Sequence, residues 1–129
     1  MGPNDASRPV IRAALKVHTA LGAGLLERAY EACLFYELTQ ACLQFEHQVR
    51  LPIVYNGLTL QGAYRVDFIV EKCLIVEIKC AEKLLPVHLA QVLSYLRLGH
   101  YQLGLLINFN VPHLRQGIRR VINGPESEL

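Results

Sequence analysis

The segment that most constrains the fold is residues 73–80, an apolar run that carries one acidic and one basic residue, Glu77 and Lys79. Its β-branched residues are typical of a buried strand. Side chains two positions apart leave a strand on the same face, so Glu77 and Lys79 should stand side by side where apolar residues normally pack. A buried charge costs roughly several kcal/mol unless it is paired or bound to a metal. The pair therefore indicates either a structural ion pair or a functional site.

The preceding run, residues 64–70, repeats this pattern with one acidic residue, Asp67, and residues 71–73 separate the two runs. The two runs predict a β-hairpin, whose register decides whether Asp67 meets Glu77. A two-residue loop would mix polar and apolar residues on both faces. A three-residue loop over residues 71–73, or an equivalent bulge, brings Asp67 beside Glu77. One face is then wholly apolar and carries Val66, Phe68, Val70, Leu74, Val76 and Ile78.

Asp67, Glu77 and Lys79 together predict a metal site. Two opposed carboxylates repel each other unless a proton or a cation lies between them. Hard divalent cations such as Mg²⁺ and Mn²⁺ prefer carboxylate oxygens. A neighbouring ammonium helps a water to ionise or stabilises charge on a phosphate, as in metal-assisted phosphodiester hydrolysis. Because Asp…Glu-x-Lys is a common pattern, this hypothesis depends on the strand context and the shared face.

A second polar group falls in a helix that the sequence predicts from Pro86 to Gly99. His88, Gln91 and Tyr95 lie at positions i, i+3 and i+7 and form one stripe. A solvated helix edge explains each residue alone. As a set beside a metal site, they could orient a water, a ligand or a phosphate.

These residues resemble a known superfamily. Asp67, Glu77-x-Lys79 and Gln91-x-x-x-Tyr95 are similar to the motifs of the PD-(D/E)xK nucleases, especially the RecB-type exonucleases with their Q-x-x-x-Y helix.

The amino-terminal half of the chain resembles one smaller family within this superfamily. Residues 24–30, Gly-Leu-Leu-Glu-Arg-Ala-Tyr, resemble the signature of the small bacterial GxxExxY proteins, and the likeness continues through residues 82–86 and 105–110. Val66 stands where the superfamily's name places Pro.

The resemblance implies a restriction-endonuclease-like core and a role for each matching residue. The implied catalytic residues are Glu27, Asp67, Glu77, Lys79, Gln91 and Tyr95. The implied ligands of Mg²⁺ or Mn²⁺ are Asp67, Glu77, Ile78 through its backbone carbonyl, and Glu27. Tyr30, one turn beyond Glu27, could hold that carboxylate in place.

The whole chain fits one domain of 129 residues, with residues 1–7 and 124–129 as flexible ends. Helices are expected over residues 8–21, 27–41 and 86–99, and strands over residues 45–55, 58–70, 73–80 and 103–109, with a hairpin turn at Asn56 and Gly57. A short last helix is expected from Pro112, carrying Arg115, Arg119 and Arg120. This order predicts an α/β fold with a mixed central β-sheet flanked by helices.

Composition adds expectations about the setting of the protein. No segment is long and apolar enough to span a membrane and the first residues lack the regions of a signal peptide, so we expect a cytoplasmic protein. The four cysteines show no C-x-x-C spacing, which favours reduced thiols over disulfides, a zinc site or an iron–sulfur cluster. A formal charge of +2 does not commit the chain to nucleic acid. Leucines around residues 22–24 lack an obvious cover, so a homo-oligomer is also an option.

Three functions remain open on the sequence alone. The first is a Mg²⁺-dependent nuclease acting on DNA. The second is a catalytically silent nuclease fold retained as a binding or assembly module. The third is a hydrolase of another phosphoester, or an RNA nuclease.

Overall fold

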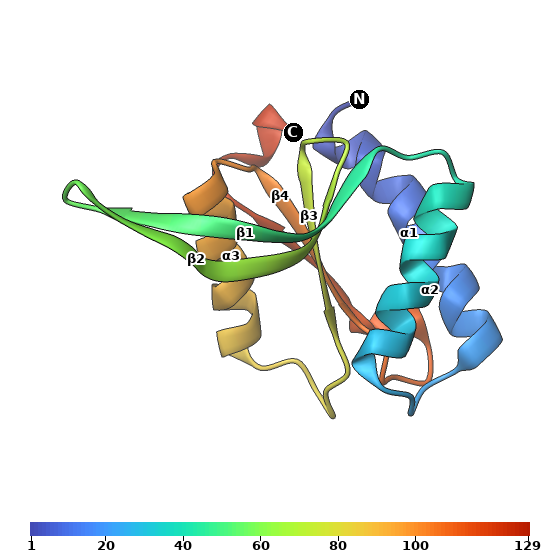
Figure 1. The fold of residues 1–129 in the computed structure, drawn as a ribbon. Helices are drawn as coiled ribbons and strands as arrows, with labels where there is room; N and C mark the ends of the chain where they lie inside the picture. Colours follow the sequence, from blue (N-terminus) through green and yellow to red (C-terminus); the bar gives the residue numbers. More distant parts are fainter.

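The structure is a computed structural model that describes residues 1–129, apart from the side chain of residue 128. Five strands form one mixed sheet in the order β1-β2-β3-β4-β5, with α1 and α2 on one face and α3 on the other (Figure 1). Only β3 and β4 pair in parallel, and α3 connects them. The predicted α/β fold with a mixed sheet is confirmed. The elements are α1 (Pro3–Leu21), α2 (Glu27–Gln40), β1 (Phe45–Tyr55), β2 (Leu58–Val70), β3 (Leu74–Lys79), α3 (Pro86–Gly99), β4 (Leu103–Asn108) and β5 (Ile118–Ile122), with 3₁₀ turns η1 (Leu114–Gly117) and η2 (Glu126–Glu128).

The sheet separates two apolar cores. On one face, α1 and α2 bury Val10, Tyr30 and Leu34 against sheet residues that include Phe68 and Val76. The other core lies beneath α3 and contains Val66, Ile69, Ile75, Val92, Leu96 and Leu106. Burying a leucine, isoleucine or phenylalanine side chain stabilises the fold by about 1.5–3 kcal/mol, so both helical layers are held by their apolar faces. No helix in the described part of the chain is both long and apolar enough to cross a membrane.

Gly104 in β4 lets α3 lie close to the sheet. A Cβ atom at this position would stand 2.8 Å from Cγ1 of Val92 and 3.4 Å from Cδ2 of Leu96. Because the first of these distances is well inside van der Waals contact, any side chain at position 104 would force Val92, or α3 with it, to shift.

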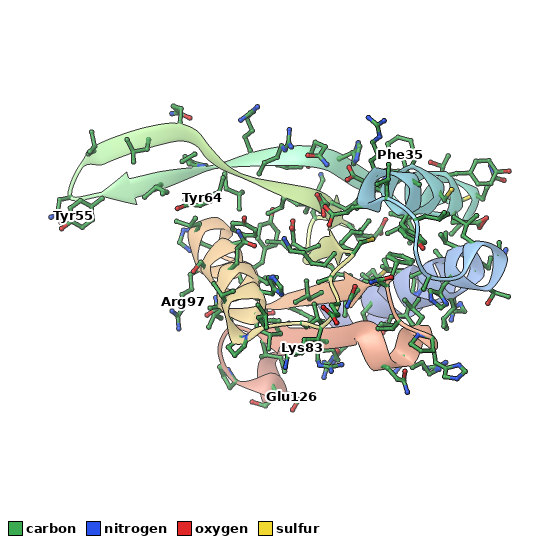
Figure 2. The ribbon with its side chains drawn as sticks, turned by 90° about the horizontal axis from the view of Figure 1, so that it is seen from below. Phe35, Tyr55, Tyr64, Lys83, Arg97 and Glu126 are labelled. Atoms are coloured by element: carbon green, nitrogen blue, oxygen red, sulfur yellow. The ribbon has the colours of Figure 1, made fainter. Side chains whose placement is uncertain are left out.

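Strands β1 and β2 continue past the sheet as a long hairpin, which we call the arm (residues 51–64; Figure 1). Asn56 and Gly57 form the predicted two-residue turn, with φ angles of 46° and 82°. Figure 2 shows Tyr55 at the far tip of the arm and Tyr64 on the part that faces α3. The arm therefore overhangs one side of that helix.

The turn between β2 and β3 has the predicted length of three residues. Val70 pairs with Leu74, and Glu71 and Lys72 take positive φ angles of 52° and 58°. The prediction that Val66 and Phe68 share one apolar face of the hairpin is wrong. Val66 packs beneath α3, while Phe68 packs beneath α1 and α2. The strict alternation breaks at Asp67, where the ladder between β2 and β3 ends.

Both ends of the chain contact the folded core. Residues 1–7 were expected to be a flexible end, yet α1 begins at Pro3 and buries Ala6 and Ser7. Proline at the first helical position and Asp5 in the first turn favour this start. Leu129 packs against the same core, and Figure 1 shows the two termini near each other.

The expected last helix is also wrong. After the single turn η1, Ile118–Ile122 forms β5 and pairs antiparallel with β4, so Arg119 and Arg120 lie on an edge strand. A Cβ at Gly117 would stand 2.1 Å from the carbonyl oxygen of Asn108. This close backbone contact turns the chain along β4, and β-branched residues then favour a strand.

Candidate active site

Asp67 and Glu77 meet where β2 and β3 separate. The last pair of the ladder is Phe68 with Val76, so Asp67 and Glu77 would form the next one. Instead, Oε1 of Glu77 accepts the backbone N–H of Asp67 at 2.7 Å, and Oδ2 of Asp67 accepts the backbone N–H of Ile78 at 2.8 Å. The two carboxylates thus replace the ladder bonds that the strands no longer exchange.

Both carboxylates are buried enough to resist ionisation. Burial is the main cause that raises the pKa of Glu77 to about 8, and the negative charge of Asp67 adds to it. Burial likewise raises the pKa of Asp67 to about 6, while the hydrogen bond from Ile78 works in the opposite direction. Near neutral pH the pair is therefore stabilised by a proton or a cation.

Lys79 lies two residues beyond Glu77 on β3, and its side chain is half-buried. Its positive charge lowers the pKa of Glu77, opposing the effect of burial. The structure thus brings Asp67, Glu77 and Lys79 together at one end of β3.

Glu27 is the first residue of α2 and is exposed. Its negative charge raises the pKa of both Asp67 and Glu77, so it belongs to the same electrostatic environment. Among the residues that the structure describes, no three His, Cys, Asp or Glu side chains form a group that could hold a metal ion. Glu27 is therefore linked to the pair by its charge, without a direct contact in the structure.

Tyr30 does not hold Glu27 as we expected. Its hydroxyl donates to the carbonyl of Gly22 at 2.6 Å and accepts the N–H of Leu25 at 3.1 Å, while its ring stacks on Phe109 with centroids 4.6 Å apart. The side chain is fully buried and so points into the core, away from the carboxylate. It fixes the turn that leads into α2.

Gln91 and Tyr95 line a groove between the arm and α3, about 810 Å³ in volume. The groove is lined by Ile53, Tyr64, Val87, His88, Ala90, Gln91, Ser94, Tyr95, Arg97 and Leu98. The rings of Tyr64 and Tyr95 lie 5.9 Å apart between centroids. Burial, and then the charge of Glu77, raises the pKa of Tyr95, so the charge of the carboxylate pair extends to this side of the groove. His88 accepts the N–H of Leu85 through Nδ1 at 3.0 Å and caps α3.

The sequence reasoning missed Gln48, which reaches Asp67 from β1. Its Nε2 donates to Oδ1 of Asp67 at 3.3 Å and to Oε2 of Glu31. Gln48 lies between the flanking pairs His47–Phe68 and Val49–Val66, directly across from Asp67. Only the register of β1 against β2 could have revealed this contact.

Comparisons with known proteins show which superfamily the chain belongs to. The sequence profile of the PD-(D/E)XK nuclease superfamily matches residues 4–121. No curated protein sequence matches the chain significantly. The crystal structure of SSO0001 is similar with a TM-score of 0.59 and 20% sequence identity, over 79% of this chain and 52% of that one. The chain thus spans about half the length of SSO0001, and this similarity concerns the fold alone. Because the superfamily profile extends over nearly all of α1 to β5, the chain belongs to the PD-(D/E)XK nuclease superfamily.

Proposed function

We propose that the protein is a divalent-metal-dependent nuclease that hydrolyses phosphodiester bonds, with DNA as its substrate. The observation that carries this proposal is the burial of Asp67 against Glu77, with Lys79 on the same strand. Buried like charges are unfavourable unless a proton or cation compensates them, and the fold retains both. Members of this superfamily generally use divalent metals.

The donor set fits a hard cation. Asp67 and Glu77 offer carboxylate oxygens, which Mg²⁺ and Mn²⁺ prefer, and the backbone N–H groups that already bind one oxygen of each hold them in place. In this proposal, these two residues hold the metal together with the carbonyl of Ile78. Glu27 would join them only if its exposed side chain turned toward the pair. A bound divalent cation supplies Lewis-acid polarisation of a phosphate and lowers the pKa of a water.

Lys79 acts on the reacting phosphate in this proposal. It leaves β3 two residues beyond Glu77, on the same strand face, so its ammonium would lie near the negative charge that develops as a phosphodiester is attacked. A fixed cation in a site with little water stabilises such charge more than it does in bulk solvent. Lys79 therefore stabilises the transition state without being a metal ligand.

The groove beside α3 would hold the nucleic acid. Tyr64 and Tyr95 present aromatic rings on which a base could stack, and Arg97 supplies a positive charge for a phosphate. Figure 2 places Tyr64 on the arm side and Arg97 on the helix side. Gln91 and Tyr95 then orient the phosphate or the attacking water between the groove and the pair.

One observation favours a second function, a catalytically silent module with the nuclease fold. The carboxylates of Asp67 and Glu77 accept the backbone N–H groups at the end of the ladder, so they also have a purely structural use. A binding or assembly protein could keep them for that reason alone.

The deciding experiment titrates Mg²⁺ and Mn²⁺ into the protein by calorimetry and incubates it with labelled single- and double-stranded DNA. We expect metal binding and cleavage by the wild type, and loss of both in Asp67→Asn and Glu77→Gln. Glu46→Gln, which removes an exposed carboxylate from β1, is the matched control and should behave as the wild type. A wild-type protein that binds neither ion and cleaves neither DNA would contradict the nuclease proposal and leave the silent module in its place.

A further inference from the structure

Gln48 bridges two carboxylates that come from different elements. Its Nε2 donates to Oδ1 of Asp67 in β2 and to Oε2 of Glu31 in α2. The other oxygen of Asp67, Oδ2, accepts the N–H of Ile78. Both oxygens of this carboxylate are thus held by donors, one from the backbone of β3 and one from the side chain of Gln48.

The amide of Gln48 can face these carboxylates in only one way. Its nitrogen donates to both, whereas rotating the amide would turn Oε1 toward them, which is unfavourable when both are ionised. Among the described residues, Oε1 is buried without a hydrogen-bond partner. The backbone of Gln48 has a φ of 56°, in the left-handed region that side chains rarely adopt. An unpaired buried oxygen and a strained backbone at one residue call for a functional explanation.

Glu31 is itself held by His47, which contacts the same oxygen that accepts from Gln48. Nε2 of His47 contacts Oε2 of Glu31, and the His47 ring stacks on Phe68 with centroids 4.8 Å apart and meets the edge of Phe35 at 5.2 Å. The side chain of Glu31 is only 15% exposed. A continuous series of contacts therefore runs from His47 through Glu31 and Gln48 to Asp67.

We infer that Gln48 is a positioning residue that sets the orientation of the Asp67 carboxylate, and that Glu31 acts by holding Gln48. Donors around a ligating carboxylate fix its direction and tune its affinity for the metal. This inference rests on the proposed function only where it concerns metal binding. The orientation of Asp67 is a property of the metal-free protein and can be tested separately.

The first test uses the metal-free protein and the backbone amide of Ile78, which donates to Asp67. In Gln48→Ala, we expect the Ile78 amide proton to shift in the ¹H–¹⁵N NMR spectrum and to exchange faster with solvent, because Asp67 loses one of its two donors. Gln61→Ala is the matched control, since Gln61 is an exposed glutamine on β2. It should leave the Ile78 resonance unchanged.

The second test measures Mn²⁺ affinity by calorimetry, and kcat and KM separately. Gln48→Ala should weaken Mn²⁺ binding about tenfold or more and lower kcat with little change in KM, while the urea midpoint stays close to wild type. Glu31→Ala should have the same effect, and the double variant should be no worse than either single one. Glu31→Gln, which keeps an oxygen for Gln48 but loses the charge, should recover most of the Mn²⁺ affinity lost in Glu31→Ala.

Two results would overturn the inference: an unchanged Ile78 amide in Gln48→Ala, or Glu31→Gln being as impaired as Glu31→Ala. The second result would mean that Glu31 acts by its charge alone. If the wild type binds no Mn²⁺ and cleaves nothing, the proposed function fails, and the Ile78 amide alone decides whether Gln48 orients Asp67.

Discussion

The carboxylate of Glu77 accepts the backbone N–H of Asp67 at 2.7 Å, while Asp67 reaches back across the gap to the next residue of β3. This exchange of side-chain and backbone bonds holds two acidic groups next to each other where two strands separate. An acidic pair on mobile loops would swing apart to reduce its repulsion. Here the backbone prevents that movement, so the repulsion must be relieved by a proton or a cation.

The stability of the metal-free protein should fall as the pH rises from about 5 to about 8. The pKa of Asp67 is raised from 3.8 to about 6 and that of Glu77 from 4.5 to about 8, so the folded state binds more protons than the unfolded state across this range. The stabilisation from these protons is complete below about pH 4. It is lost as the pH rises through the folded pKa values.

Urea unfolding of wild type and Glu77→Gln at several pH values checks this. The free energy of unfolding of the variant should depend less on pH, and added Mg²⁺ should raise that of the wild type most at pH 8. Equal slopes for the two proteins would show that Glu77 ionises normally in the folded state.

Lys79→Ala should abolish DNA cleavage while leaving the fold and most of the Mn²⁺ affinity intact. The ammonium acts on the phosphate or the water and is not a ligand in our proposal. Calorimetry and a cleavage assay on the same preparation measure both properties. Lys72→Ala, at the exposed turn between β2 and β3, removes the same charge away from the site and should remain active. Loss of metal binding in Lys79→Ala would assign the lysine a structural role.

Tyr64→Ala should raise KM for DNA with a smaller effect on kcat, because Tyr64 lines the groove but lies away from the carboxylates. Losing one stacked base costs about 1–3 kcal/mol, which is roughly a fivefold to 150-fold weaker binding. Tyr55→Ala is the control, since Tyr55 is also an exposed tyrosine of the arm but lies at its tip (Figure 2). Equal effects of the two changes would mean that the whole arm, and not the groove, contacts the substrate.

Tyr30→Phe should lower the free energy of unfolding by about 1–3 kcal/mol, because it leaves the carbonyl of Gly22 and the N–H of Leu25 without their partner. Urea unfolding measures the change. Tyr36→Phe in the same helix alters an exposed tyrosine and should have almost no effect. If both variants unfold at the same urea concentration, water must bond the carbonyl of Gly22 and the N–H of Leu25 as well as Tyr30 does.

The carboxylate pair could be predicted from the sequence because the hairpin that carries it is local. Residues 64–80 contain alternating apolar residues on both sides of a short polar turn, and only one register buries them well. The three-residue turn and the pairing of Val70 with Leu74 are confirmed. Local turn chemistry also gave the correct hairpin at Asn56 and Gly57.

The contact between Gln48 and Asp67 could not be predicted, because it depends on an irregular register between β1 and β2. Counting back from the Asn56–Gly57 turn in a regular hairpin puts Glu46 opposite Asp67. The pairing shifts between Leu51 and Ile53, where β2 contains extra residues, and this shift puts Gln48 there instead. The prediction for Tyr30 was wrong for a related reason. Its spacing from Glu27 indicated a contact between the two side chains, but the structure buries Tyr30 in the core instead.

Gly104, one strand away from the carboxylates, is a position where a change outside the proposed motif would still reach the proposed site. A methyl group there would stand 2.8 Å from Cγ1 of Val92, so the side chain of Val92, or α3 with it, would have to shift. Gln91 and Tyr95 lie on the same helix and line the groove. In our proposal, a relative with such a change would keep Asp67, Glu77 and Lys79 and yet hold the groove differently, and a comparison of these three residues alone would not detect it.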